Sequence, residues 1–254
     1  MNIPRRFLAA PAVGFAALLM MGAPAMAAES GSAQADLQPI PLNDAPGSGS
    51  AMVEIDGSTL SFTLTAKGLL AEAPHAAHIH FGADARHECP TAEDDADGGG
   101  TINTTDGAPA YGPIVVSLTT TGDTSPDSGL AVDRFGVGDD INYSRGDVQV
   151  SAEVAAGILA GEAAVVVHGV DHDGSGAYDG DTKSDLDPAL PTEATDPALC
   201  GVLNASQMDM PAGGVQTGEA AVGGTDLGLI VAGGAAALAG GALLVARRRT
   251  STDS

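Results

Sequence analysis

Four of the chain's six histidines lie in one fifteen-residue segment, 75–89, which reads HAAHIHFGADARHEC. His78 and His80 are separated by one residue, so in a β-strand both imidazole rings leave the same face and can meet one metal ion. Imidazole pairs of this kind suit copper or zinc when further ligands converge from elsewhere in the fold. His168, which ends a separate apolar segment, is the natural third ligand. A lone His-x-His pair is a weak signal, because it is more often a polar strand face.

Two acidic segments, 95–106 (DADGGGTINTTD) and 171–182 (DHDGSGAYDGDT), share the pattern Asp-x-Asp-Gly-x-Gly-x-apolar-Asn/Asp. A twelve-residue loop wraps calcium with oxygen ligands at positions 1, 3, 5 and 9, a glycine at position 6 and an acid at position 12. The predicted calcium ligands are Asp95, Asp97, Asn103 and Asp106 in the first loop, and Asp171, Asp173, Ser175 and Asp179 in the second. Because no helical pattern flanks either segment, we expect calcium-type loops in a β scaffold rather than EF-hands. Solvated turns are the alternative.

The charge of the chain favours cations as partners. It carries 33 acidic and 10 basic residues, a formal net charge of −23 at pH 7. Such a surface repels nucleic acid and anionic lipid, so neither is an expected partner. For most of these acids, solubility or a salty habitat is the simpler explanation.

The two ends of the chain predict export and anchoring. Residues 1–27 combine a basic start, an apolar run and a small-residue pattern before Ala27, which is typical of a secretory signal peptide. Residues 227–246 are twenty uncharged residues, about the length that crosses a ~30 Å hydrocarbon core. The arginines at 247–249 follow directly, and the positive-inside tendency places them in the cytoplasm and the preceding domain outside. Because VQTGE precedes this run, the same residues also resemble a sortase cell-wall sorting signal, although the usual Leu-Pro is absent.

Short apolar segments separated by Gly, Asp and Pro clusters predict an all-β sandwich or barrel between the two ends. The predicted elements are a hairpin over 51–69 around the turn Asp56-Gly57, strands at 112–120 and 162–168, and a helix at 151–161. The predicted organisation is a signal peptide at 1–27, an extracellular domain at 28–204, a Gly- and Ala-rich stalk at 205–226, a transmembrane helix at 227–246 and a basic tail at 247–254.

Cys89 and Cys200 are the chain's two cysteines, and in an exported protein they predict one disulfide bond. Closing a loop of roughly 110 residues stabilises the fold by about 4 to 5 kcal/mol on the chain-entropy model. Two free thiols are the alternative.

The motifs HAAHIHFG followed by a cysteine, VVVHGVDHDG, and LCGVL near the domain's end resemble, in order and spacing, the copper-zinc superoxide dismutases. The hairpin and AHIHFG resemble more closely the CHRD domain, a chordin-type module of many exported bacterial proteins that is similar in pattern to those dismutases. The resemblance covers roughly residues 36–204 and implies a Greek-key β-sandwich or barrel. It implies that His78, His80 and His168 are copper ligands, that His75 supports them, and that Cys89 pairs with Cys200.

Departures from the dismutase pattern argue against a zinc site and against capture of an anion. Dismutases place a bridging histidine and zinc ligands after the first cysteine, but no histidine lies between Cys89 and Val167, so only His87 could replace the bridge. The arginine that holds the anion stands three residues before the second cysteine, where this chain has Pro197. The acidic segment after His168 should also repel superoxide.

The sequence therefore predicts an exported, surface-anchored CHRD-type protein that binds copper, calcium or both as an interaction or metal-handling module. The alternative is a copper-only superoxide dismutase-like enzyme that protects the cell envelope. No zinc and no nucleic acid are expected, and the sequence names no protein partner.

Overall fold

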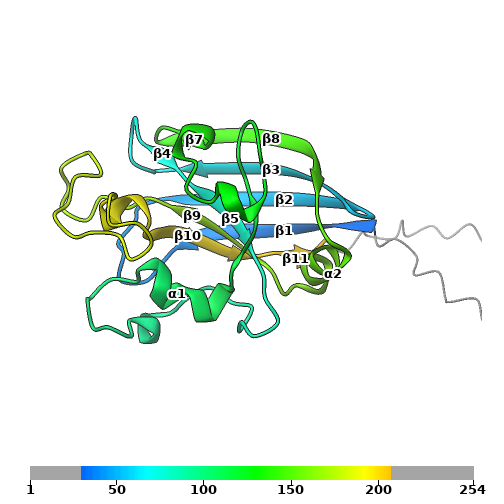
Figure 1. Cartoon of the computed structure of the whole chain (residues 1–254), viewed down its shortest axis with the longest axis horizontal. Coiled ribbons are helices and arrows are strands. Elements are labelled where there is room, and N and C mark those ends of the chain that lie inside the picture. The colour runs from blue at the N-terminus through cyan, green and yellow to red at the C-terminus, as the bar shows by residue number, and fades with distance from the viewer. Residues whose placement is uncertain (1–29, 207–254) are drawn as a thin grey trace, which may run out of the picture. The chain divides into compact units, whose positions relative to one another are not determined.

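The computed structural model describes residues 30–206 (Figure 1). The predicted signal peptide, transmembrane helix and basic tail, and nearly all of the predicted stalk, lie outside the described residues. Within 30–206, no helix is both long and apolar enough to cross a membrane.

The described residues form an all-β fold, as predicted, built on one nine-stranded antiparallel sheet in the order β6-β5-β9-β10-β1-β2-β3-β8, with β11 beside β1. The strands are β1 (Ser30–Pro39), β2 (Ser48–Asp56), β3 (Thr59–Lys67), β5 (Ala77–His80), β6 (Ile114–Ser117), β8 (Asp140–Gln149), β9 (Ala164–His168), β10 (Pro197–Val202) and β11 (Asn204–Ala205). Two short strands, β4 (Pro74–His75) and β7 (Gly136–Val137), pair separately.

Strand β1 joins the two halves of this sheet. Its residues 30–37 pair with β2, whereas Gln38 and Pro39 pair with β10. The sheet therefore curls into a half-barrel rather than lying flat (Figure 1).

The β2–β3 hairpin is confirmed at the predicted turn. Asp56 pairs with Thr59, and Gly57 takes a positive φ of 63° that costs glycine little. Along β2, Val53 and Ile55 are buried, while the residues that alternate with them face solvent. This alternation places one face of the hairpin in the core.

The predicted helix at 151–161 is confirmed as α2 (Ala152–Ala160). The Ser151 side chain accepts a hydrogen bond from the Val154 N–H, and Gly161 ends the helix in the left-handed conformation.

A second helix, α1 (Thr104–Tyr111), corrects the expectation that no helix flanks the acidic segments. The Asn103 side chain accepts from the Asp106 N–H, and the Asp106 side chain accepts from the Asn103 N–H, which forms a capping box. The helix starts inside the first predicted calcium loop and contains Pro109. No periodic apolar pattern therefore marked it in the sequence.

Side chains, rather than backbone pairing, connect the two edge strands β6 and β8. The Tyr143 hydroxyl on β8 donates to the Leu118 carbonyl at 2.6 Å, and Arg145 donates to the carbonyls of Thr119 and Gly122. These bonds fasten the open edge of the half-barrel to the segment that follows β6.

The Cys89–Cys200 disulfide is present as predicted, and it ties the loop after β5 to the central strand β10. Beside it, Ile40, Ile102 and Tyr111 form a small second core. Because every residue of β9 is buried, His168 lies on a strand in the interior of the fold.

Candidate metal centre

The structure brings His78, His80 and His168 together, as the sequence predicts. His78 and His80 lie on β5, which pairs with β9, and His168 is the last residue of β9. One ring nitrogen from each histidine lies within 4.8 Å of the other two, and each residue is only 3% exposed. Two strands that are distant in sequence therefore place three imidazoles around one point.

A backbone carbonyl fixes the orientation of each imidazole. The Nε2–H of His78 donates to Gly129 O at 3.0 Å. The Nδ1–H of His80 donates to Gly112 O at 2.8 Å, and the Nδ1–H of His168 donates to Thr195 O at 2.7 Å. Because a carbonyl oxygen only accepts, each bonded nitrogen carries the proton, and the other nitrogen presents a lone pair.

The three remaining ring nitrogens, His78 Nδ1, His80 Nε2 and His168 Nε2, are buried and have no hydrogen-bond partner among the described residues. An unpaired buried polar atom costs about 1 to 3 kcal/mol, so three at one point need an explanation. A bound metal ion would give these nitrogens a partner, and histidine ligands commonly donate their other ring N–H to a carbonyl, as these three do. The donor set therefore fits a copper or zinc ion.

The electrostatics keeps these imidazoles neutral. Burial, together with the neighbouring His168, lowers the pKa of His80 to about 3. Burial lowers the pKa of His168 to about 4, and that of His78 falls well below 6.5 for the same reason, with His168 and His80 adding to the effect. At neutral pH no proton has to leave before these nitrogens bind a metal.

Comparison with known proteins identifies the family. The model of the CHRD domain matches residues 28–177, which hold all three histidines. This chain belongs to the CHRD domain family. None of the curated proteins matches the chain.

Solved structures similar to this CHRD-family chain include superoxide dismutase 5 of Candida albicans. Its Cu(II) form has a TM-score of 0.38 and 14% identity, and the match covers 71% of this chain and 95% of that chain. A mutant of the same enzyme has a TM-score of 0.38 and 15% identity, with 74% of this chain and all of that chain covered.

His75 and His87 lie outside the three-histidine cluster. The His75 ring lies between two carbonyls, with Nε2 3.0 Å from Leu70 O and Nδ1 3.1 Å from His168 O. The Tyr178 hydroxyl lies 3.0 Å from the same Nδ1. His75 thus contacts the backbone of the predicted ligand His168. His87 stacks on Phe81 and is not part of the three-histidine cluster.

The first acidic segment gathers three of its four predicted ligands. Carboxylate oxygens of Asp95, Asp97 and Asp106 lie within 4.8 Å of one another. Asn103 serves instead as the N-cap of α1, where its oxygen already accepts a backbone N–H. Backbone N–H groups of Gly99 and Gly100 donate to Asp95, so its carboxylate is satisfied without a cation.

In the second acidic segment, two predicted ligands lie beside Glu193, which the sequence motif does not include. Asp171 and Asp173 lie close to Glu193, whereas Ser175 donates to Asp179 at 2.7 Å. Glu193 is buried and accepts the backbone N–H groups of residues 172, 179 and 180. No pattern in the chain pointed to Glu193, because it lies beyond the loop, in the segment that leads into β10.

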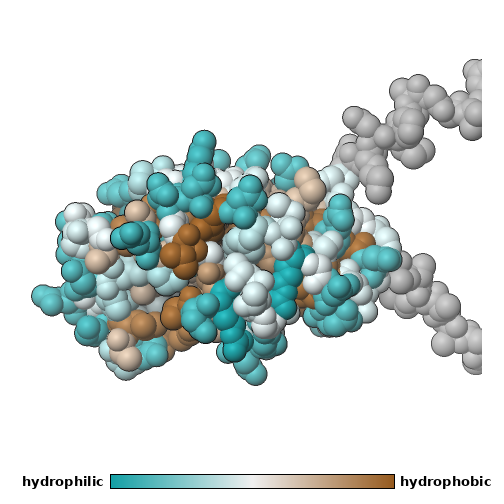
Figure 2. Space-filling view, turned by 90° about the horizontal axis from the view of Figure 1, so that it is seen from above, coloured by the Kyte–Doolittle hydropathy of each residue, from teal (hydrophilic) through white to brown (hydrophobic). Residues whose placement is uncertain are grey.

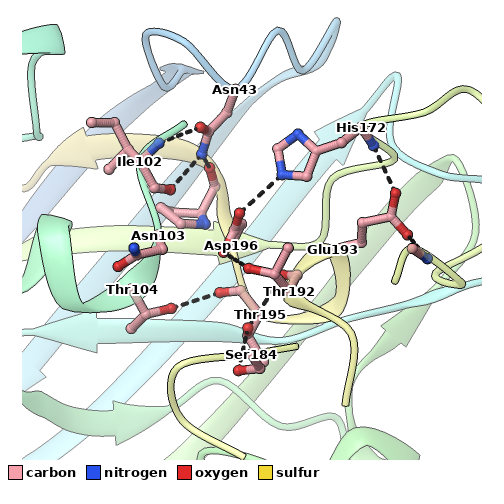
Figure 3. Close-up of polar contacts among 12 residues, drawn as sticks. Asn43, Ile102, Asn103, Thr104, His172, Ser184, Thr192, Glu193, Thr195 and Asp196 are labelled. Atoms are coloured by element: carbon pink, nitrogen blue, oxygen red, sulfur yellow. Dashed lines mark hydrogen bonds and ion pairs between the residues drawn. The ribbon is translucent and has the colours of Figure 1, made fainter. Parts of the chain in front are cut away.

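Residues 192–196 connect this acidic loop to the histidine cluster, and Figure 3 shows the contacts that His172 and Thr104 make with this segment. His172 Nε2 lies 2.9 Å from the buried Asp196 carboxylate, which also accepts the Thr192 hydroxyl at 2.7 Å. One residue earlier, Thr195 O accepts from both His168 and the Thr104 hydroxyl on α1. The carbonyl that orients His168 is therefore held by a network that sequence reasoning missed.

Buried Asn43 holds the first acidic segment against β10. Its Nδ2 donates to the carbonyls of Ile102 and Pro197, both at 2.8 Å, and its Oδ1 accepts the Ile102 N–H at 2.7 Å (Figure 3). An isolated asparagine in a loop carries no sequence signal for such a role.

Proposed function

We propose that this CHRD-family chain is an exported, surface-anchored protein that holds one copper ion through His78 Nδ1, His80 Nε2 and His168 Nε2. The observation that carries the proposal is a cluster of three buried imidazoles with ring nitrogens within 4.8 Å of one another, in which a carbonyl fixes one nitrogen of each ring and leaves the other without a partner. The protein would act as a metal-binding interaction or metal-handling module outside the cell.

Each part of the site has a separate role in this proposal. The carbonyls of Gly112, Gly129 and Thr195 select the tautomers, and burial keeps the rings unprotonated. When bound, copper supplies a redox-active ion with an open coordination position. Copper is favoured over zinc because divalent copper stands above zinc in the affinity order for nitrogen ligands.

Export and anchoring rest on the two chain ends and on the disulfide, because disulfides persist in oxidising compartments outside the cytosol. The anchor is either the predicted helix at 227–246 or the cell wall. Calcium in the two acidic loops is a further part of the proposal, supported by the three carboxylates that converge in each.

The rival function is a copper-only superoxide dismutase-like enzyme with a Greek-key fold, which the same three histidines favour. The surroundings of the histidines argue against it. Among the described residues, the cavity beside them is lined by no lysine or arginine, so nothing there attracts an anionic substrate.

Elemental analysis of the purified protein tests the proposal. The wild type should retain a single copper ion after dialysis, and His168→Ala should lose it. His87→Ala is the matched control, because His87 stacks on Phe81, is not part of the three-histidine cluster and should leave the copper content unchanged. A wild type that retains no copper would refute the proposal, and dismutase activity at the level of a true enzyme would reverse the ranking of the two functions.

A further inference from the structure

We propose that the histidine cluster is served by a cavity for a small uncharged molecule with an apolar body and a single donor atom, of the class of simple phenols. This inference rests on the proposed copper site and names the kind of molecule that reaches it.

The cavity has a volume of about 400 Å³ and is lined on one side by His78, His80 and His168. Three segments supply the other walls: α1 with the residues that follow it, the loop at 126–132 and the loop at 186–195. The lining side chains include Ala108, Tyr111, Ile114, Leu130, Val132, Leu186 and Leu190. This volume lies within the range of roughly 300 to 1,000 Å³ that is typical of sites for small molecules.

The cavity offers little to a charged ligand. Two of its polar lining side chains are already satisfied, since the Thr104 hydroxyl donates to Thr195 O and the Tyr111 hydroxyl donates to Thr104 O. Among the described residues, Asp127 is the only acidic side chain in the lining, and the lining contains no lysine or arginine. The protein side chains of the cavity would therefore leave an anion without a partner to replace its hydration.

The exposed rim of the cavity is apolar. Leu130, Val132 and Leu186 are 40 to 47% exposed, and they are three of the six large apolar side chains that the described residues expose. Figure 2 shows how hydrophilic one face of the molecule is overall, with apolar side chains in small patches. On so acidic a protein, exposed apolar side chains gathered at one cavity mark a binding site.

The histidine cluster sets the remaining requirement on the ligand. Copper held by three imidazoles leaves room for a further donor, so a molecule that reaches the ion needs one donor atom and apolar surface elsewhere. A neutral phenol has both the donor atom and the apolar surface. An alkylated benzene has only the apolar surface, and azide has only the donor atom.

The experiment titrates 4-methylphenol into the copper-loaded and the metal-free protein, with affinity measured by ligand-observed NMR and the ion monitored by Cu(II) electron paramagnetic resonance. We expect binding in both forms and a changed Cu(II) spectrum in the loaded form. Toluene should bind more weakly than 4-methylphenol to the loaded protein, and azide should not displace 4-methylphenol.

Two variants test the location of the ligand. Ala108→Phe adds a large side chain to the cavity wall on α1 and replaces none of the three histidines, and it should weaken 4-methylphenol binding at least about tenfold. Leu186→Asp places a charge at the rim of the cavity and should also weaken 4-methylphenol binding. Ala83→Phe, an equivalent change at an exposed alanine outside the cavity, should have no effect.

Copper content, measured first on every variant, separates this inference from the proposed function. If the wild type holds no copper, the proposed function fails, and binding of 4-methylphenol to the metal-free protein still decides the cavity proposal. Affinity unchanged by both Ala108→Phe and Leu186→Asp, or azide binding more tightly than the phenol, would overturn the inference.

Discussion

At the scale of single residues, the backbone decides what each histidine can do. Gly112, Gly129 and Thr195 present carbonyls to different ring nitrogens, so His78 offers Nδ1 whereas His80 and His168 offer Nε2. The sequence predicts which histidines meet, but not these partners, because a backbone carbonyl has no side-chain signature.

The same residues predict an acid-sensitive metal-free protein. The folded pKa values of His80 and His168, about 3 and about 4, lie below the ordinary value of 6.5. As the pH falls, the unfolded chain therefore binds protons before the folded protein does. The stability that the neutral His80 and His168 contribute is present above about pH 6.5 and is lost as the pH falls toward 4.

Urea unfolding of the metal-free wild type and of His168→Gln, at pH 7 and at pH 4.5, measures this loss. The wild type should lose more stability than the variant over this interval, because the variant has one fewer group to protonate. Equal losses would show that His168 does not resist protonation in the fold.

At the scale of elements, the residue pattern was enough to predict a segment where it alternates, carries a helix cap or is continuously apolar. The alternating hairpin, the capped helix α2 and the apolar strand β9 all follow from residue pattern. Strand β8 escaped prediction because only Ile141 and Val148 of its ten residues are buried, so it has no continuous alternation. Helix α1 depends on the Asn103–Asp106 capping box and on the bond from the Thr104 hydroxyl to Thr195 O, just before β10, rather than on its own propensity.

The link between the edge strands β6 and β8 can be tested at Tyr143. Tyr143→Phe removes the hydroxyl that donates to Leu118 O and leaves that carbonyl without its partner. We expect a loss of about 1 kcal/mol in the free energy of unfolding, measured by urea denaturation. Ser144→Ala, on the exposed side of the same strand, should be neutral, and a neutral Tyr143→Phe would mean that the bond adds no stability.

The acidic loops predict a response to calcium. Filling the sites should raise the melting temperature by about 2 to 4 °C for each kcal/mol of binding free energy, and a chelator should reverse the rise. Asp173→Asn should reduce the response, whereas Asp84→Asn, an exposed acid outside both loops, should retain it. Melting curves that do not change with millimolar calcium would argue for solvated turns.

At the scale of the whole molecule, the disulfide and the curled sheet hold the cluster together. Cys89–Cys200 closes a sequence separation of 111 residues and fixes the loop after β5 to β10, whose neighbour β9 carries His168. The pairing of the cysteines was predictable because the chain has only two. The role of Glu193 was not, because its contacts with the loop at 171–182 arise only from the tertiary fold.

Replacing both cysteines by serine should lower the free energy of unfolding by about 2 to 5 kcal/mol. Copper affinity should also fall, because β10, which pairs with the strand β9 that carries His168, is then less well fixed. Thiol labelling of the denatured, unreduced wild type should find no reactive cysteine, and two labelled cysteines would contradict the disulfide.

The central claim is one copper ion on three defined ring nitrogens. Pulsed electron paramagnetic resonance of the Cu(II)-loaded protein measures this most directly, because the couplings of the remote imidazole nitrogens count the histidines bound to the ion. We expect three imidazoles in the wild type and no stoichiometric copper in the His80→Ala/His168→Ala double variant. A single tightly bound copper ion that persists in the double variant would contradict it.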